Sequence, residues 1–140
     1  MTIDARVFII IAVLILAIVG VIYLTMSRTM SPSLNRIKYQ KKWLEIENSL
    51  VRDNLATYQV AIMNADKLVD LALRERKIKG ATMGERMKSA QNQWKNPQHV
   101  WGAHKVRNQL AHESDYVLSR EIALRSLSAF KQALKDLGAF

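Results

Sequence analysis

The feature that most constrains this chain is an uninterrupted run of uncharged, mostly apolar residues near its N-terminus, from Val7 to Ser27. An α-helix rises about 1.5 Å per residue, so about twenty such residues cover the roughly 30 Å hydrocarbon core of a bilayer. A secretory signal peptide is the competing interpretation, but the run is longer than a typical signal-peptide core and no A-x-A-like cleavage pattern follows Leu24. The run therefore predicts a single, permanent membrane-spanning helix.

The charges that flank this run predict its orientation. Only Arg6 precedes it, beside Asp4, whereas several basic residues follow it closely: Arg28, Arg36, Lys38, Lys41 and Lys42. Because segments rich in Lys and Arg stay on the cytoplasmic side, we expect the N-terminus outside and the rest of the chain in the cytoplasm, at the inner (plasma) membrane. The expected organisation is an anchor at residues 1–27, a linker at 28–33 and a cytoplasmic domain at 34–140.

The composition predicts that the cytoplasmic part folds by apolar packing of helices. The chain has no cysteine, which excludes disulfides and thiolate zinc sites. It has 5 Gly and 2 Pro, and 49% of its residues are hydrophobic, a composition unlike that of a disordered linker or a turn-rich β-sandwich. We therefore expect long helices.

Local signals divide residues 34–140 into helices. Four of the expected starts carry a capping side chain or a proline: Pro32 or Ser33, Thr82 with Glu85 as a capping box, Asn96-Pro97 and Ser119. Another helix is expected after a boundary at Asp53-Asn54. The expected ends of the helices are a boundary at Asp53, Lys79-Gly80, about Trp94, about Glu113 and Gly138. No strand pattern occurs in the sequence. The predicted fold is therefore all-α, with one N-terminal transmembrane helix followed by a four- to five-helix bundle.

All three histidines lie in one expected helix, within residues 96–113. At about 100° per residue, Arg107 lies on the apolar arc of that helix. A half-buried guanidinium is costly without an anionic partner, so Arg107 requires a nearby carboxylate or a bound phosphate. His104, Asn108 and His112 form a polar stripe beside it at spacings of four.

Metal and nucleophile sites fit this stretch poorly. His99 and His104 are five residues apart and His104 and His112 are eight apart, whereas two zinc-binding histidines on one helix are separated by four. No cysteine is present to complete a ligand set, and no serine lies in a recognisable nucleophile turn. We therefore expect no metal and no cofactor.

The segment Arg107-Asn108-Gln109-Leu110-Ala111-His112 resembles the signature of the HEPN superfamily, an Arg and a polar residue followed by a variable spacer and a His. The four-residue spacer lies within that family's range, and the resemblance covers about residues 34–140. It implies an all-helical fold, a homodimer in which two copies of the motif face each other, and metal-independent cleavage of RNA. Residue by residue, it implies catalytic roles for Arg107 and His112 and an orienting role for Asn108.

These side chains suit that chemistry. The imidazole of His112 can serve as a general acid or base, and the planar fork of Arg107 can hold a phosphate as its charge builds. On one helix the two residues differ by about 140° and about 7.5 Å in rise, which favours a site shared by two chains. The alternative is structural, in which Arg107 and His112 cap carbonyls or pair with acidic residues.

A second group of charges surrounds Gly80. Its basic members are Arg74, Arg76, Lys77, Lys79, Arg86 and Lys88. Because the whole chain carries a formal charge of +9, we expect attraction to phosphate, and this group is a candidate contact for RNA or for lipid phosphate. A solvated helix end is the alternative interpretation.

The sequence thus predicts a membrane-anchored, HEPN-like protein that is a candidate metal-independent endoribonuclease or RNA-binding dimer. A non-catalytic helical interaction module, tethered to the membrane, is the alternative, and in it Arg107 makes a buried ion pair that fixes packing. A third interpretation is a scaffold that binds anionic lipid through Lys38, Lys41 and Lys42. A regulatory protein partner is also expected.

Overall fold

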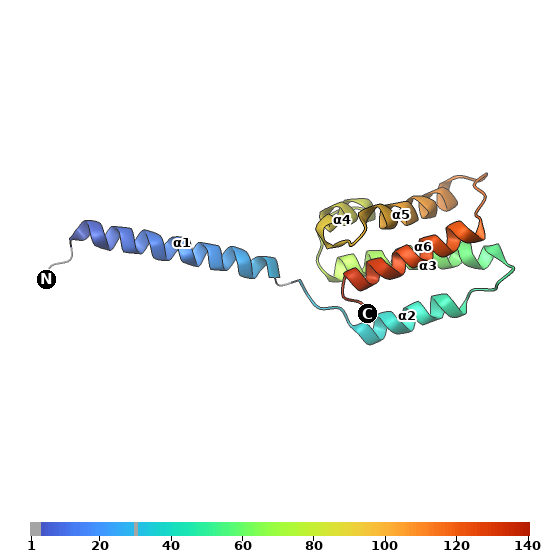
Figure 1. Cartoon of the computed structure of the whole chain (residues 1–140), viewed down its shortest axis with the longest axis horizontal. Helices are drawn as coiled ribbons and strands as arrows, with labels where there is room; N and C mark the ends of the chain where they lie inside the picture. Colours follow the sequence, from blue (N-terminus) through green and yellow to red (C-terminus); the bar gives the residue numbers. More distant parts are fainter. Residues whose placement is uncertain (1–3, 30) are drawn as a thin grey trace. The chain divides into compact units, whose positions relative to one another are not determined.

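The computed structural model describes residues 4–29 and 31–140, and over that part of the chain all regular structure is helical (Figure 1). In chain order the helices are α1 (Ala5–Thr29), α2 (Arg36–Asn48), α3 (Leu55–Glu75), α4 (Met83–Ser89), the 3-10 turn η1 (Gln91–Gln93), α5 (Pro97–His112) and α6 (Arg120–Asp136). The chain divides into two compact units, Met1–Ser31 and Pro32–Phe140. The all-α prediction is therefore confirmed.

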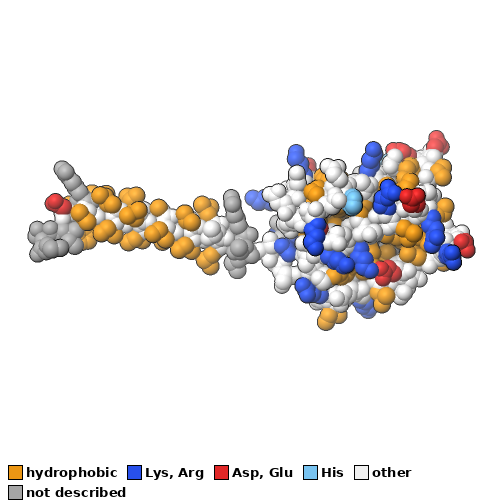
Figure 2. All heavy atoms as spheres, in the orientation of Figure 1, with side chains coloured by type: hydrophobic (Ala, Val, Ile, Leu, Met, Phe, Trp, Pro, Cys, Tyr) orange, Lys and Arg blue, Asp and Glu red, His pale blue; other side chains and the backbone are white. Residues whose placement is uncertain are grey.

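Helix α1 is the segment expected to cross the membrane. Its stretch Val7–Met26 is long and apolar enough to span a bilayer, although a signal sequence passes the same test of length and composition. Figure 2 shows the apolar side chains of this stretch exposed along the helix. The side chains of Arg6 and Arg28, and residues 1–3 and 30 of the expected anchor and linker, lie outside the described part.

Helices α2 to α6 form a bundle in which α3 and α6 are central. Helix α3 packs against α2, α4, α5 and α6, and α5 packs against α6. In Figure 1, α2 runs along one side of the α3 and α6 pair, and α5 runs along the other side. The largest fully buried side chains come from α2, α3, α4, α6 and the C-terminal segment: Tyr39, Ile62, Val69, Leu73, Met87, Phe130, Leu134 and Leu137.

The predicted helix starts are confirmed except for the first. The expected caps Thr82, Asn96 and Ser119 each accept a hydrogen bond from a backbone N–H in the first turn of the next helix. At the boundary predicted at Asp53-Asn54, the side chain of Asn54 does the same for α3. The prediction that Pro32 or Ser33 opens the first helix of the bundle is wrong. Helix α2 begins at Arg36, because the side chain of Asn35 caps it by accepting the N–H of Lys38.

The predicted end of α3 at Lys79-Gly80 is one turn too late, because the helix ends at Glu75. Lys77 adopts a left-handed conformation with φ of 56°, and the N–H of Ile78 donates to the carbonyl of Leu73. This is the hydrogen-bond pattern of a Schellman motif. Ile78 packs against the core, so burial of this side chain accompanies the early stop.

The predicted end of the next helix near Trp94 is also wrong, since α4 ends at Ser89. Trp94 is buried beyond the short turn η1, and its indole N–H donates to the carbonyl of Met87 at 3.0 Å. The carbonyls in the last turn of a helix have no hydrogen-bond partner within the helix. The Trp94 indole supplies a donor to one of them, that of Met87.

A polar cluster connects α2 to the C-terminal end of α3. Lys38 forms an ion pair with the Glu75 carboxylate, and the hydroxyl of Tyr39 donates to the second oxygen of Glu75 at 2.9 Å. The hydrogen bond from Lys38 is the largest influence that lowers the pKa of Glu75. Burial, followed by the hydrogen bond to Glu75, raises the pKa of Tyr39.

This cluster is expected to make stability depend on pH in acid. Because the pKa of Glu75 is lower in the folded state, its contribution is fully present above its unfolded pKa of about 4.3 and is lost as the pH falls through the folded value. The free energy of unfolding should therefore fall more steeply below about pH 5 in the wild type than in Glu75→Gln, which cannot titrate there. Urea unfolding of the full chain in detergent micelles, followed by circular dichroism, measures both slopes, and equal slopes would contradict this assignment.

Candidate functional site

Arg107 lies against a buried carboxylate from another helix. Its Nε is 3.2 Å from Oδ2 of Asp66 on α3, whose side chain is 3% exposed, and Nδ1 of His104 is 2.8 Å from Oδ1. Within the described residues Arg107 Nε has no aligned hydrogen-bond acceptor, so its contact with Asp66 is an ion pair rather than a directed hydrogen bond. Asp66 is the anionic partner that the position of Arg107 requires.

Asn108 is in direct contact with Arg107. Arg107 Nη1 donates to Asn108 Oδ1 at 2.9 Å, and both side chains are partly buried. The guanidinium therefore contacts Asp66 through Nε and Asn108 through Nη1. Two of the three predicted catalytic residues are thus brought together and are held on one stretch of α5.

His112 lies apart from this pair. It is the last residue of α5 and is exposed, and within the described residues its side chain makes no hydrogen bond or ion pair. It borders an open hollow formed by the loop after α5, with Glu113, Ser114, Asp115, Tyr116 and Val117. Arg107 and Asn108 do not line that hollow. Helix α5 is continuous from Pro97 to His112, so the angular separation expected from the sequence applies.

The sequence interpretation missed two buried carboxylates on α3, Asp66 and Asp70. A signal for them was present, because both lie at helical spacing on the stripe that Ile62 and Val69 define. An acidic residue on such a stripe is costly unless a cation from elsewhere in the fold reaches it. Asp66 joins α5 to α3 in this way, and Asp70 joins α4 to α3.

Asp70 has a cation on each of its oxygens. Arg86 of α4 donates from Nε to Oδ1 at 2.8 Å, and Arg74 donates from Nε to Oδ2 at 2.9 Å. The Arg86 side chain is 9% exposed, and its Nη1 also donates to the carbonyl of Gly80 at 2.7 Å. A Cβ at Gly80 would lie 2.5 Å from the backbone nitrogen of Arg86, so a residue without Cβ is required at this approach.

The basic residues around Gly80 therefore do not form one free surface. Three have partners inside the fold: Arg74 and Arg86 at Asp70, and Arg76, whose Nη1 donates to the carbonyl of Leu137 at 2.8 Å. The others are exposed lysines: Lys77, Lys79 and Lys88. These lysines, with the mostly exposed Arg74, are the part of the predicted phosphate-binding group that can face a ligand.

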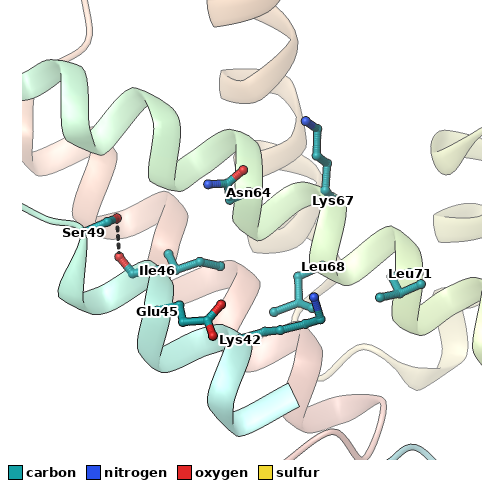
Figure 3. Close-up of a pocket in the computed structure, with 8 residues that line it drawn as sticks. All are labelled: Lys42, Glu45, Ile46, Ser49, Asn64, Lys67, Leu68 and Leu71. Atoms are coloured by element: carbon teal, nitrogen blue, oxygen red, sulfur yellow. Dashed lines mark hydrogen bonds between the residues drawn. The ribbon is translucent and has the colours of Figure 1, made fainter. Parts of the chain in front are cut away.

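Two hollows lie away from the motif. The first, of about 300 Å³, lies between α2 and α3, and Figure 3 shows charged and polar side chains from both helices around it. Its polar lining is Lys42, Glu45, Ser49, Asn64 and Lys67. The second, of about 570 Å³, lies between α5 and α6, over Gly102, Ala103, Val106 and Ile122. Arg107, Asn108 and His112 line neither hollow.

Residues 4–29 and 31–140 contain no group of three or more His, Asp or Glu side chains placed to hold a metal ion. The resemblance to the HEPN superfamily remains a prediction. Comparisons of the chain with protein-family models, with curated proteins and with solved structures find no match.

Proposed function

We propose that this protein is a membrane-anchored, HEPN-like module that binds RNA and cleaves it without a metal, as a dimer, through Arg107, Asn108 and His112. The observation that carries the proposal is the contact of Arg107 with both Asp66 and Asn108, on the helix that ends in the exposed imidazole of His112. A guanidinium held in place before the substrate arrives stabilises a developing phosphorane without reorganisation. An imidazole without internal partners is available for proton transfer.

The separation of these groups supports a site shared by two chains. On the continuous helix α5, Arg107 and His112 differ by about 140° and about 7.5 Å in rise, so one chain does not direct both at one phosphate. A second copy of the motif supplies the group that the first lacks. Confinement of two anchors in one membrane raises the local concentration of the bundles and so favours pairing.

We place the bundle in the cytoplasm at the inner membrane. The support is the excess of basic residues after α1, which include Arg36, Lys41 and Lys42. This orientation also gives the bundle access to cellular RNA. The exposed lysines beside Gly80 are proposed to add phosphate contacts that do not depend on the RNA sequence.

Loss of the His112 imidazole is expected to abolish cleavage but not folding. The 140-residue chain in detergent micelles, incubated with labelled RNA in EDTA, should release fragments that end in a 2′,3′-cyclic phosphate. His112→Ala should lower the rate by about 100-fold or more, the usual contribution of a general acid or base. The melting temperature should stay unchanged, because His112 is exposed and has no partner within the described residues.

His99→Ala is the matched control, since His99 is another exposed histidine of α5 that lies outside the motif. It should cleave at the wild-type rate. Equal rates in the wild type and His112→Ala, or no cleavage by a folded, dimeric wild type, would remove the catalytic part of the proposal.

A second function is favoured by the ion pair between Asp66 and Arg107. In a non-catalytic interaction module this pair packs α5 onto α3, and no substrate is needed to explain where Arg107 lies. The partner is then a protein, such as a regulator at the membrane. Two results together would support this function. The folded protein should leave RNA intact, and its variants should lose partner binding only when the bundle is destabilised.

A further inference from the structure

The outer face of α2 is apolar although nothing in the described chain covers it. Ile37 is 80% exposed and Leu44 is 54% exposed, and exposed Lys41 lies between them. Spacings of four and three place these three side chains on one face of the helix. The opposite face carries the buried residues Tyr39, Trp43 and Ile46. Helix α2 is therefore apolar on two sides, and the bundle uses one of them.

The exposed charge beside this apolar face is mostly positive. Arg36 and Lys41 are exposed at the N-terminal part of α2, and Lys42 extends over the hollow between α2 and α3, as Figure 3 shows. Of the two carboxylates in the helix, Glu45 is exposed and lines the same hollow as Lys42, and Glu47 is bonded to Lys131, with 2.6 Å between Oε1 and Nζ. Exposed apolar side chains flanked by cations are typical of a helix that lies in the interface of an anionic membrane.

The covalent connection keeps this face close to a membrane. Helix α1 ends at Thr29 and α2 begins at Arg36, so only six residues separate them. Fully extended, those residues span about 20 Å. A tether of this length gives the headgroups a high effective concentration at α2, so that even weak docking becomes populated.

We propose that the face formed by Ile37, Lys41 and Leu44, with Arg36 beside it, docks on the anionic headgroups of the membrane that holds α1. A lipid surface suits these residues better than a protein does. A specific protein interface buries about 800 Å² on each partner, whereas this face offers two large apolar side chains. Lipid docking needs only shallow insertion of such side chains, together with attraction between lysine or arginine and phosphate.

Docking through α2 has a consequence for the other side of the bundle. Helices α2 and α5 lie on opposite sides of α3 and α6 (Figure 1). The docked bundle therefore presents α5, with Arg107 and His112, away from the headgroups. The inference does not depend on cleavage of RNA, because any partner of α5 gains the same access.

The absence of cysteine from the 140 residues permits site-specific labelling of the whole chain. Ile37→Cys, Leu44→Cys and Ser128→Cys each accept one polarity-sensitive dye, and exposed Ser128 of α6 is the control because it lines a hollow between α5 and α6. The proteins are reconstituted in phosphatidylcholine vesicles with or without phosphatidylglycerol, and a spin-labelled lipid is added as quencher.

In vesicles that contain phosphatidylglycerol, the emission at positions 37 and 44 should shift to the blue and be quenched, while position 128 stays unquenched. Lys41→Glu in the same background should abolish both effects and leave the circular dichroism spectrum unchanged, since Lys41 is exposed. Equal quenching at all three positions would overturn the proposal. A blue shift that follows protein density in the vesicle and ignores the spin label would overturn it as well, and would assign the face to a second copy.

Discussion

Replacement of Asp70 by alanine is expected to lower the free energy of unfolding of the bundle by about 3–5 kcal/mol, the usual cost when one partner of a buried ion pair is removed. The reason is Arg86, whose side chain is 9% exposed and whose Nε and Nη2 both face Asp70 Oδ1. Without the carboxylate, the guanidinium keeps its hydrogen bond to the carbonyl of Gly80 but remains a buried, uncompensated charge. Urea unfolding of the full chain in micelles measures the loss.

A matched control is Glu121→Ala on α6. Like Asp70 with Arg74, Glu121 pairs with an arginine four residues later on its own helix, Arg125. The side chains of Glu121 and Arg125 are 80% and 73% exposed. Removal of this exposed pair should cost less than about 1 kcal/mol. If Asp70→Ala costs no more than this control, the buried pair does not hold α4 to α3.

Much of the fold could be predicted because its determinants are local. The caps at Thr82, Asn96 and Ser119 act within one helical turn, so the residue type and the following few positions are enough to identify them. The ends of α3 and α4 were predicted wrongly because they depend on distant packing. Ile78 and Trp94 reach the core from beyond these ends, and local sequence does not report what a side chain meets in the fold.

The candidate site, too, could be predicted only where local sequence determines it. The position of Arg107 on an apolar arc predicted an anionic partner, and the structure supplies one. The sequence did not identify that partner, because Asp66 lies on another helix, far from Arg107 along the chain. The basic group around Gly80 failed as a single surface for a related reason. A list of charges does not reveal that Arg76 and Arg86 are already bonded inside the fold.

Arg107→Lys is expected to separate the two functions proposed for α5. Lysine keeps the positive charge that Asp66 requires but lacks the planar fork that holds a phosphate and contacts Asn108. In the ribonuclease, single-turnover cleavage should fall by about 100- to 1000-fold, as it does when one donor to a transition-state oxyanion is lost, while stability changes little. In the interaction module there is no cleavage to lose, and Arg107→Lys should keep both fold and partner.

Arg107→Ala completes the comparison because it removes the charge as well as the fork. It leaves buried Asp66 with His104 as its remaining partner, and should cost about 1–3 kcal/mol of stability in either function, measured by urea unfolding in micelles. The decisive comparison is therefore between the loss of cleavage rate and the loss of stability in Arg107→Lys. A large loss of cleavage at nearly constant stability requires that the guanidinium acts on the substrate. Parallel losses of cleavage and stability would mean that Arg107 serves only to pack α5 against α3.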